Sequence, residues 1–311
     1  MKKVRLADIA GKTGVSIQHV SRALTGNGRI ARETRERIRE QARRMGYFDT
    51  PQTGYIAVLS PFDLDDWNVL CLDVLRAYGR KGILLPFREF TAHDEHYFDG
   101  AIYTNGVDRV EQIWYSDFQI PLITINRYGN SMEQIESVLP DADGEMRMAL
   151  EHLAGLGHRK IVRLHPTNLT NTRRNVTRGE VGFFRAAEEL GIRNSVRNET
   201  YDPAEKVKEI LPRLLQEGFT AFIVVADPDH QRILDIFRQC GKRIPEDVSL
   251  VVYEIDLPPE LGLTAVKIEN RRVLETGIQL FLEKLAGHPI PVQTIVPSTF
   301  NIRNSTGRVH S

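Results

Sequence analysis

A short segment near the N-terminus concentrates side chains that form hydrogen bonds, namely Gln18, His19, Ser21 and Arg22. Gln and Arg side chains bind base edges in the major groove of DNA, and Ser bonds to phosphates. At helical spacing they lie on the outer face of a helix whose apolar side is formed by Val20, Ala23 and Leu24. An ordinary helical hairpin needs no such polar face, so the pattern favours a helix that reads DNA.

The elements that would position this helix lie within residues 6–24, LADIAGKTGVSIQHVSRAL. Two apolar-periodic segments flank a four-residue break, in which Gly14 permits a tight turn and Ser16 is placed to cap the second helix. The spacing predicts two short helices that cross steeply as a helix-turn-helix. The alternative is a pair of ordinary helices within a larger helical domain.

Charge is distributed unevenly along the chain, although its 41 basic and 41 acidic residues cancel. Residues 1–50 contain 12 Lys and Arg against 5 Asp and Glu, so the remaining chain is acidic to the same extent. A basic end matches a polyanionic partner such as DNA, and the alternative is a merely solvated basic surface. A third helix, predicted at residues 32–45, completes a compact head.

The remaining composition indicates a globular protein that stays in the cytoplasm. No apolar run approaches the length of a membrane span, and the basic N-terminus leads into a helix instead of a signal peptide. Cys71 and Cys240 are far apart, so we expect reduced thiols. Without a nucleophile elbow, a phosphate-binding loop or paired carboxylates, we expect no enzyme, no cofactor and no metal. The run from His93 to His96 lacks a third ligand and is interpreted as a surface loop.

From Tyr55 the pattern changes to buried strands that alternate with helices. Strands are predicted at residues 55–60 and 82–87, with a helix at 67–80 between them. This alternation predicts parallel sheets with helices on both faces. About eleven residues separate Phe87 from the strand near Ala101, which is too few for a full crossover. We therefore expect that crossover helix to be shortened or missing.

The N-terminal segment, followed by TRERI at residues 34–38 and Met45-Gly46-Tyr47, resembles the DNA-binding head of the LacI/GalR family of bacterial transcription regulators. The resemblance implies that Ile17 and Gln18 are the main base readers and that Arg22 is a further base contact. It also implies residues that touch or flank the DNA backbone: Leu6, Ser16, His19, Ser21, Thr25, Arg29 and Thr34. Ile17 stands where a polar or aromatic residue is commoner, and would contact a thymine methyl group.

The sequence departs from the family pattern after Tyr47. Family members continue with a hinge helix that orders on the operator and inserts Leu into the minor groove. Residues 48–54 include a Pro and a Gly and leave room only for a short tether. We therefore expect two-fold symmetric binding with weaker bending of the DNA.

Resemblance to the same family continues in residues 121–164, in Pro-Glu-Asp-Val-Ser at 245–249 and in IRNST at 302–306. It implies a periplasmic-binding-protein-like (type I) sensor of two α/β lobes with parallel sheets, joined to an all-α helix-turn-helix head. We expect the head at residues 1–47, a linker at 48–54 and an effector-binding and dimerisation domain at 55–311. The N-lobe would comprise about 55–139 and 267–290, and the C-lobe about 140–266 and 291–311.

In such sensors a small ligand lies between the lobes, at the carboxyl ends of the strands. Sugar ligands require planar donors, carboxylates and an aromatic surface. The matching loops offer such groups in Phe62, Asp63, Trp67, Asn126, Arg127, Arg178, Asp227 and Glu254. Each could instead be a solvated loop residue or, for Trp67, an aromatic residue that packs within the lobe. Arg173, Arg174 and Arg178 would either favour an anionic effector or form a solvated charged face.

We therefore expect a cytoplasmic, sequence-specific transcription regulator, in the role of a repressor of carbohydrate-metabolism genes. It would bind a palindromic DNA operator as a homodimer and respond to a small, sugar-like effector. The alternative is a cytoplasmic sugar-type ligand-binding protein whose DNA head is vestigial.

Overall fold

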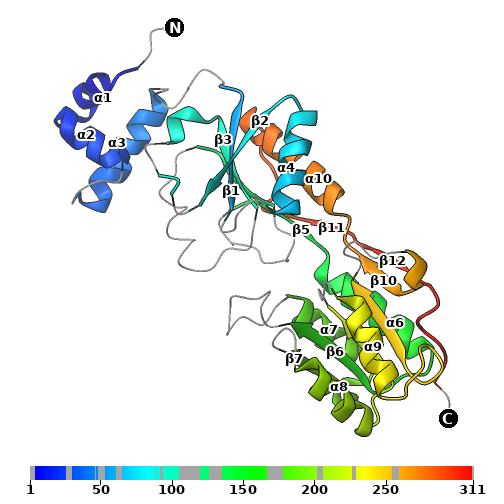
Figure 1. Ribbon diagram of the computed structural model, residues 1–311. Coiled ribbons are helices and arrows are strands. Elements are labelled where there is room, and N and C mark those ends of the chain that lie inside the picture. The colour runs from blue at the N-terminus through cyan, green and yellow to red at the C-terminus, as the bar shows by residue number, and fades with distance from the viewer. Residues whose placement is uncertain are drawn as a thin grey trace. The chain divides into compact units, whose positions relative to one another are not determined.

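A computed structural model of the chain describes residues 4–25, 30–45, 47, 53–60, 65–87, 89–91, 94–104, 120–125, 135–166, 178–201, 206–225, 229–253 and 259–309. The chain divides into two compact units: Met1–Leu139 with Asn270–Thr294, and Pro140–Glu269 with Ile295–Ser311. Each unit contains a six-stranded sheet, and the first also contains three N-terminal helices (Figure 1).

The N-terminal helices form a head with its own apolar core. They are α1 (Leu6–Thr13), α2 (Ile17–Thr25) and α3 (Arg32–Arg44). Gly14 ends α1 in the left-handed region at φ 71°, a backbone conformation that glycine adopts without strain. Ser16 caps α2, because its Oγ accepts a hydrogen bond from the backbone N–H of His19 at 3.2 Å. Both turn predictions are confirmed. The core contains Ile9, Ala10, Val20, Ala23, Leu24, Ile38 and Ala42.

The first sheet has the strand order β11-β5-β4-β3-β1-β2. Its strands are β1 (Tyr55–Ser60), β2 (Lys81–Pro86), β3 (Gly100–Tyr103), β4 (Leu122–Ile125), β5 (Ser137–Pro140) and β11 (Gln293–Val296). Strands β1 to β5 pair in parallel. One face is covered by α4 (Asp66–Ala77) and α10 (Asn270–Leu285), which also contact each other. Gly82 permits the close approach of α4, since a Cβ there would lie 2.5 Å from Leu72 Cδ2.

The connection from β2 to β3 covers the opposite face of this sheet with aromatic residues in place of a full helix. In the described residues of this connection the only helical element is the 3₁₀ turn η1 (Glu95–Tyr97). Phe87 packs edge-on against Tyr103, and Phe90 against Phe98, each pair with 5.8 Å between ring centroids. The predicted shortening of this crossover is confirmed.

The second sheet has the order β12-β10-β9-β8-β6-β7. Its strands are β6 (Ile161–Pro166), β7 (Val196–Tyr201), β8 (Ala221–Val224), β9 (Ser249–Tyr253), β10 (Thr264–Lys267) and β12 (Thr299–Asn301). Neighbouring strands are parallel except that β12 is antiparallel to β10. The predicted α/β fold with parallel sheets is confirmed, with this antiparallel edge as an addition.

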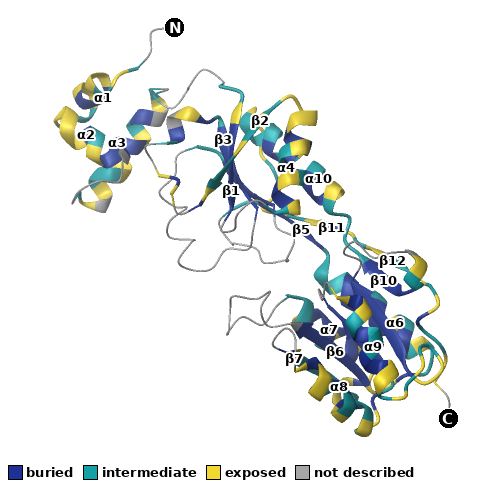
Figure 2. Cartoon of the chain, viewed as in Figure 1, coloured by how far each residue is buried: buried dark blue, intermediate teal, exposed yellow. Residues whose placement is uncertain are grey.

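Helices cover both faces of the second sheet. Apolar residues of α6 (Ala142–Gly155) and α7 (Arg178–Glu189) form one core layer, and those of α8 (Val207–Gln216) and α9 (His230–Gln239) form the other. Two 3₁₀ turns, η3 (Arg193–Ser195) and η4 (Pro259–Leu261), lie in connections. Figure 2 shows the buried strands between helices whose outer surfaces are exposed. Among the described helices none is both long and apolar enough to cross a membrane.

Candidate DNA-binding surface and effector-binding site

The outer surface of α2 and its N-cap present five of the ten predicted DNA-contacting residues to solvent. Ser16, Gln18, His19 and Arg22 are exposed, and the side chain of Ile17 is 52% exposed although it is a large apolar residue. The opposite side of α2 is buried in the head through Val20, Ala23 and Leu24. One face of α2 therefore carries the potential base contacts, and the opposite face packs into the apolar core of the head.

The remaining predicted DNA contacts differ in their positions. Leu6 is half-buried against the head core, and Ser21 and Thr34 are half-buried. Arg29 and the side chain of Thr25 lie outside the described residues. Sequence reasoning missed one contact that holds the head together. Arg39 is buried, and its Nε donates a hydrogen bond to the backbone oxygen of Ala23 at 3.3 Å, which connects α3 to the end of α2.

The end of the linker is fixed to the first sheet by one carboxylate, Asp99, just before β3. Its oxygens accept hydrogen bonds from Thr53 N at 2.6 Å, Thr53 Oγ1 at 2.9 Å and Gly54 N at 3.0 Å. Arg80 completes the group with an ion pair to Asp99 at 3.3 Å. We call Thr53, Gly54, Arg80 and Asp99 the linker anchor. The rest of the predicted linker, residues 48–52, lies outside the described residues.

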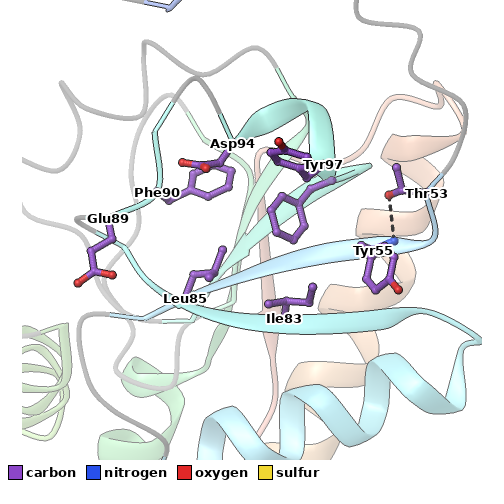
Figure 3. Close-up of a pocket in the computed structure, with 9 residues that line it drawn as sticks. Thr53, Tyr55, Ile83, Leu85, Glu89, Phe90, Asp94 and Tyr97 are labelled. Carbon is purple, nitrogen blue, oxygen red and sulfur yellow. Dashed lines mark hydrogen bonds between the residues drawn. The ribbon is translucent and has the colours of Figure 1, made fainter.

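A cavity of about 600 Å³ lies beside the linker anchor. Figure 3 shows Tyr55, Ile83 and Leu85 on strands β1 and β2, facing Phe90 and Tyr97 of the shortened crossover. Thr53 lines the same cavity, and its Oγ1 accepts a hydrogen bond from Tyr55 N at 3.1 Å. The cavity thus lies between strands β1 and β2 of this sheet and the described part of the β2–β3 connection.

At the carboxyl ends of β1 and β3 a buried polar network lies beside Trp67. Asn68 Nδ2 donates to Ser60 Oγ at 3.0 Å, and Thr104 Oγ1 donates to Asn68 Oδ1 at 2.7 Å. Trp67 is 3% exposed, and its Nε1 has no hydrogen-bond acceptor in the described part of the chain. Burial of the ring fits the alternative of a packing aromatic, whereas the unpaired N–H fits a ligand contact. The role of Trp67 in ligand binding stays a prediction.

In the second unit, polar side chains gather on the α6/α7 side of the sheet. Arg178 is the half-buried first residue of α7. Glu145 is buried near the start of α6 and accepts hydrogen bonds from Tyr253 Oη at 3.1 Å and Ser298 Oγ at 2.6 Å. Burial raises the pKa of both the Glu145 carboxyl and the Tyr253 hydroxyl. Arg163, in the middle of β6, is also buried.

Six of the eight predicted effector contacts lie outside the described residues: Phe62, Asp63, Asn126, Arg127, Asp227 and Glu254. The two described ones, Trp67 and Arg178, belong to the first and second unit respectively. Sequence reasoning missed the Ser60, Asn68 and Thr104 network, because Thr104 lies 36 positions after Asn68 and only the sheet brings the two together. Within the described residues no group of three or more His, Cys, Asp and Glu side chains is arranged to hold a metal ion.

Comparisons with known proteins match both parts of the chain. A family described as bacterial regulatory proteins, lacI family, matches residues 5–49, and a periplasmic binding protein-like domain matches residues 150–306. The chain is 25% identical to the HTH-type transcriptional regulator MalR of Streptomyces coelicolor, over 92% of each chain. It is also 25% identical to the ribose operon repressor of Halalkalibacterium halodurans, over 97% of this chain and 96% of that one. Both relatives are named as regulators and not as enzymes, as expected for this chain.

Solved structures share the fold. A lac repressor dimer bound to operator and the anti-inducer ONPF matches with a TM-score of 0.68 and 20% sequence identity. The match covers 98% of this chain and all of that one. The order of a helical head followed by a two-lobed α/β domain is therefore common to both.

Proposed function

Because the chain belongs to the LacI family of bacterial regulatory proteins, we propose that it represses carbohydrate-metabolism genes by binding a palindromic operator as a homodimer. A sugar-like effector would change its affinity for DNA, and its place of action would be the cytoplasm. The proposed domains are the head at residues 1–47, the linker at 48–54 and the two-lobed sensor at 55–311.

The observation that carries the proposal is the exposed surface of α2. An apolar Ile17, 52% exposed at the start of a capped helix, costs solvation free energy unless a partner covers it. Gln18 and Arg22 lie exposed on the same short helix and have the hydrogen-bonding geometry for purine edges in the major groove. Together with the basic N-terminal segment, this surface suits DNA better than it suits another protein.

A sugar-like effector is supported by the chemistry of the first sheet's carboxyl edge. Ser60, Asn68 and Thr104 form a buried polar network there, and the Nε1–H of Trp67 has no acceptor among the described residues. A polar strand edge beside an aromatic ring suits a polyhydroxylated ligand. The similarity to a ribose operon repressor supports the same class of effector. The homodimer is supported by the dimeric state named for the lac repressor structure.

The test is an electrophoretic mobility shift with DNA selected from a random pool by the full chain. We expect Gln18→Ala and Arg22→Ala each to weaken binding by about 10- to 100-fold, equivalent to the loss of one bidentate base contact. Arg44→Ala is the matched control, since Arg44 is an exposed arginine of the same head that pairs with Glu40 on α3.

The alternative function, a ligand-binding protein with a vestigial head, gives a different result. In that case selection enriches no sequence, and the α2 variants bind DNA as weakly as the unaltered chain does. Retention that depends on salt but not on sequence would also refute the proposed regulator.

A further inference from the structure

Arg163 is a buried cation in the second unit that forms no salt bridge with a described carboxylate. Arg163 lies on β6 and is 3% exposed, and its Nη1 donates a hydrogen bond to Asn198 Oδ1 at 2.7 Å. Its Nε is buried and has no acceptor among the described residues, and no described carboxylate forms an ion pair with it. The guanidinium is therefore held by one neutral amide.

This arrangement is unfavourable for the protein alone. A guanidinium stays charged at physiological pH, and a buried charge without a counter-charge loses its hydration and gains little in return. Ile161, two positions earlier on β6, belongs to the apolar layer beneath α6 and α7. An apolar side chain of similar length at position 163 would fit this layer without the desolvation penalty, so stability of the fold does not explain the arginine.

The guanidinium lies against the first turn of α7. A Cβ built on Gly179, the second residue of this twelve-residue helix, would be 3.6 Å from Arg163 Nη2. The first turn of a helix carries N–H groups without intrahelical partners and a partial positive charge. A cation beside this terminus is repelled by it, and both positive groups would be stabilised by one anion that contacts both of them.

Two titratable groups lie near this guanidinium. Arg163 is level with Val251 across the sheet, so Tyr253, the last residue of β9, lies two residues further along the same face, and Glu180 lies in the first turn of α7. The carboxyl end of β9 is thus close to the guanidinium, and ligands of such sheets bind at the carboxyl ends of the strands. Glu180 opposes an incoming anion, whereas Arg178 in the same turn favours it.

We propose that Arg163, positioned by Asn198, and the first turn of α7 bind an oxyanion group of the effector, either a phosphate or a carboxylate. This inference rests on the proposed function and narrows its effector from sugar-like to an acidic sugar derivative. The planar guanidinium offers two parallel donors to an oxyanion, and the helix N–H groups offer further donors from a fixed direction.

The test measures thermal unfolding of the full chain with inorganic phosphate, acetate or chloride at equal ionic strength. We expect phosphate or acetate, but not chloride, to raise the Tm by about 4 °C at ten times its Kd. Arg163→Met should abolish this rise while leaving the Tm without anion unchanged or higher, because the buried charge is gone. The control Arg185→Gln, an exposed arginine of the same helix paired with Asp143, should keep the rise.

The inference is overturned if neither oxyanion raises the Tm more than chloride does. It is also overturned if Arg163→Met keeps the Tm rise, or if the control Arg185→Gln loses the Tm rise as completely as Arg163→Met does. If Arg163→Met does not fold, Asn198→Ala is measured instead, and a rise equal to that of the unaltered chain overturns the inference. A mobility shift on the same samples separates the two claims. Site-specific DNA binding without a Tm rise in oxyanion refutes only the oxyanion site. A Tm rise in oxyanion without site-specific DNA binding refutes only the proposed function as a transcription regulator.

Discussion

Replacing Asp99 with Ala removes the one carboxylate that holds the linker anchor together. Its side chain is 7% exposed and accepts from Thr53, Gly54 and Arg80. Hydrogen bonds to a charged group contribute about 1.5–3 kcal/mol each, but the freed donors of Thr53 and Gly54 regain water. We therefore expect Asp99→Ala to lower the free energy of unfolding by about 3 kcal/mol, or the Tm by about 9 °C.

The same substitution should weaken DNA binding in a specific way. Without the anchor, residues 53 and 54 join the tether, so the head is less restricted and the effective concentration of the second head at its half-site falls. We expect the affinity for a palindromic site to fall about twofold and the affinity for a single half-site to remain unchanged. Urea unfolding and mobility shifts on the two DNAs measure both effects.

Asp73→Ala is the control for this prediction, because Asp73 is a half-exposed carboxylate that pairs with Arg76 on the surface of α4. It should change the free energy of unfolding by no more than about 0.5 kcal/mol. If Asp99→Ala has a free energy of unfolding as high as that of Asp73→Ala, the stabilising role of the linker anchor is refuted. If its affinity falls equally for half-site and palindromic DNA, the effect on the tether is refuted.

Two further predictions concern pH and DNA bending. His158 is buried, and its ring nitrogens bond to Thr220 Oγ1 and Ser249 Oγ at 2.8 Å each. Burial lowers its pKa, so the unfolded chain binds the proton more readily, and stability should fall as pH drops from about 7 towards 5. His158→Ala should cost about 1–3 kcal/mol at pH 7.5 and flatten this pH dependence in urea unfolding, whereas the exposed His288→Ala should change neither. For bending, a seven-residue linker leaves no room for a hinge helix, so circularly permuted operator fragments should show a smaller bend than with relatives that have one; an equal central kink would contradict this.

The head and the succession of strands and helices were predictable from the sequence because they depend on local patterns. The turn at Gly14 and the cap at Ser16 follow from residue types at short spacing, and both are present. Helix α4 was also expected, although it ends at Ala77 and not at Arg80. Strands β7, β11 and β12 were not identified, because they are short or carry charged and polar residues along their length.

The sequence alone was sufficient to predict the proposed DNA-binding surface, because an amphipathic helix places Gln18 and Arg22 outward whatever the rest of the chain does. Only the tertiary structure decided which polar residues meet inside the sensor. Asp99 reaches Thr53 across 46 positions, and Arg163 reaches Asn198 across 35, because parallel strands bring distant residues side by side. In the sequence Arg163 is one charged residue within a strand, and its burial against α7, with an Nε that has no acceptor among the described residues, exists only in the folded chain.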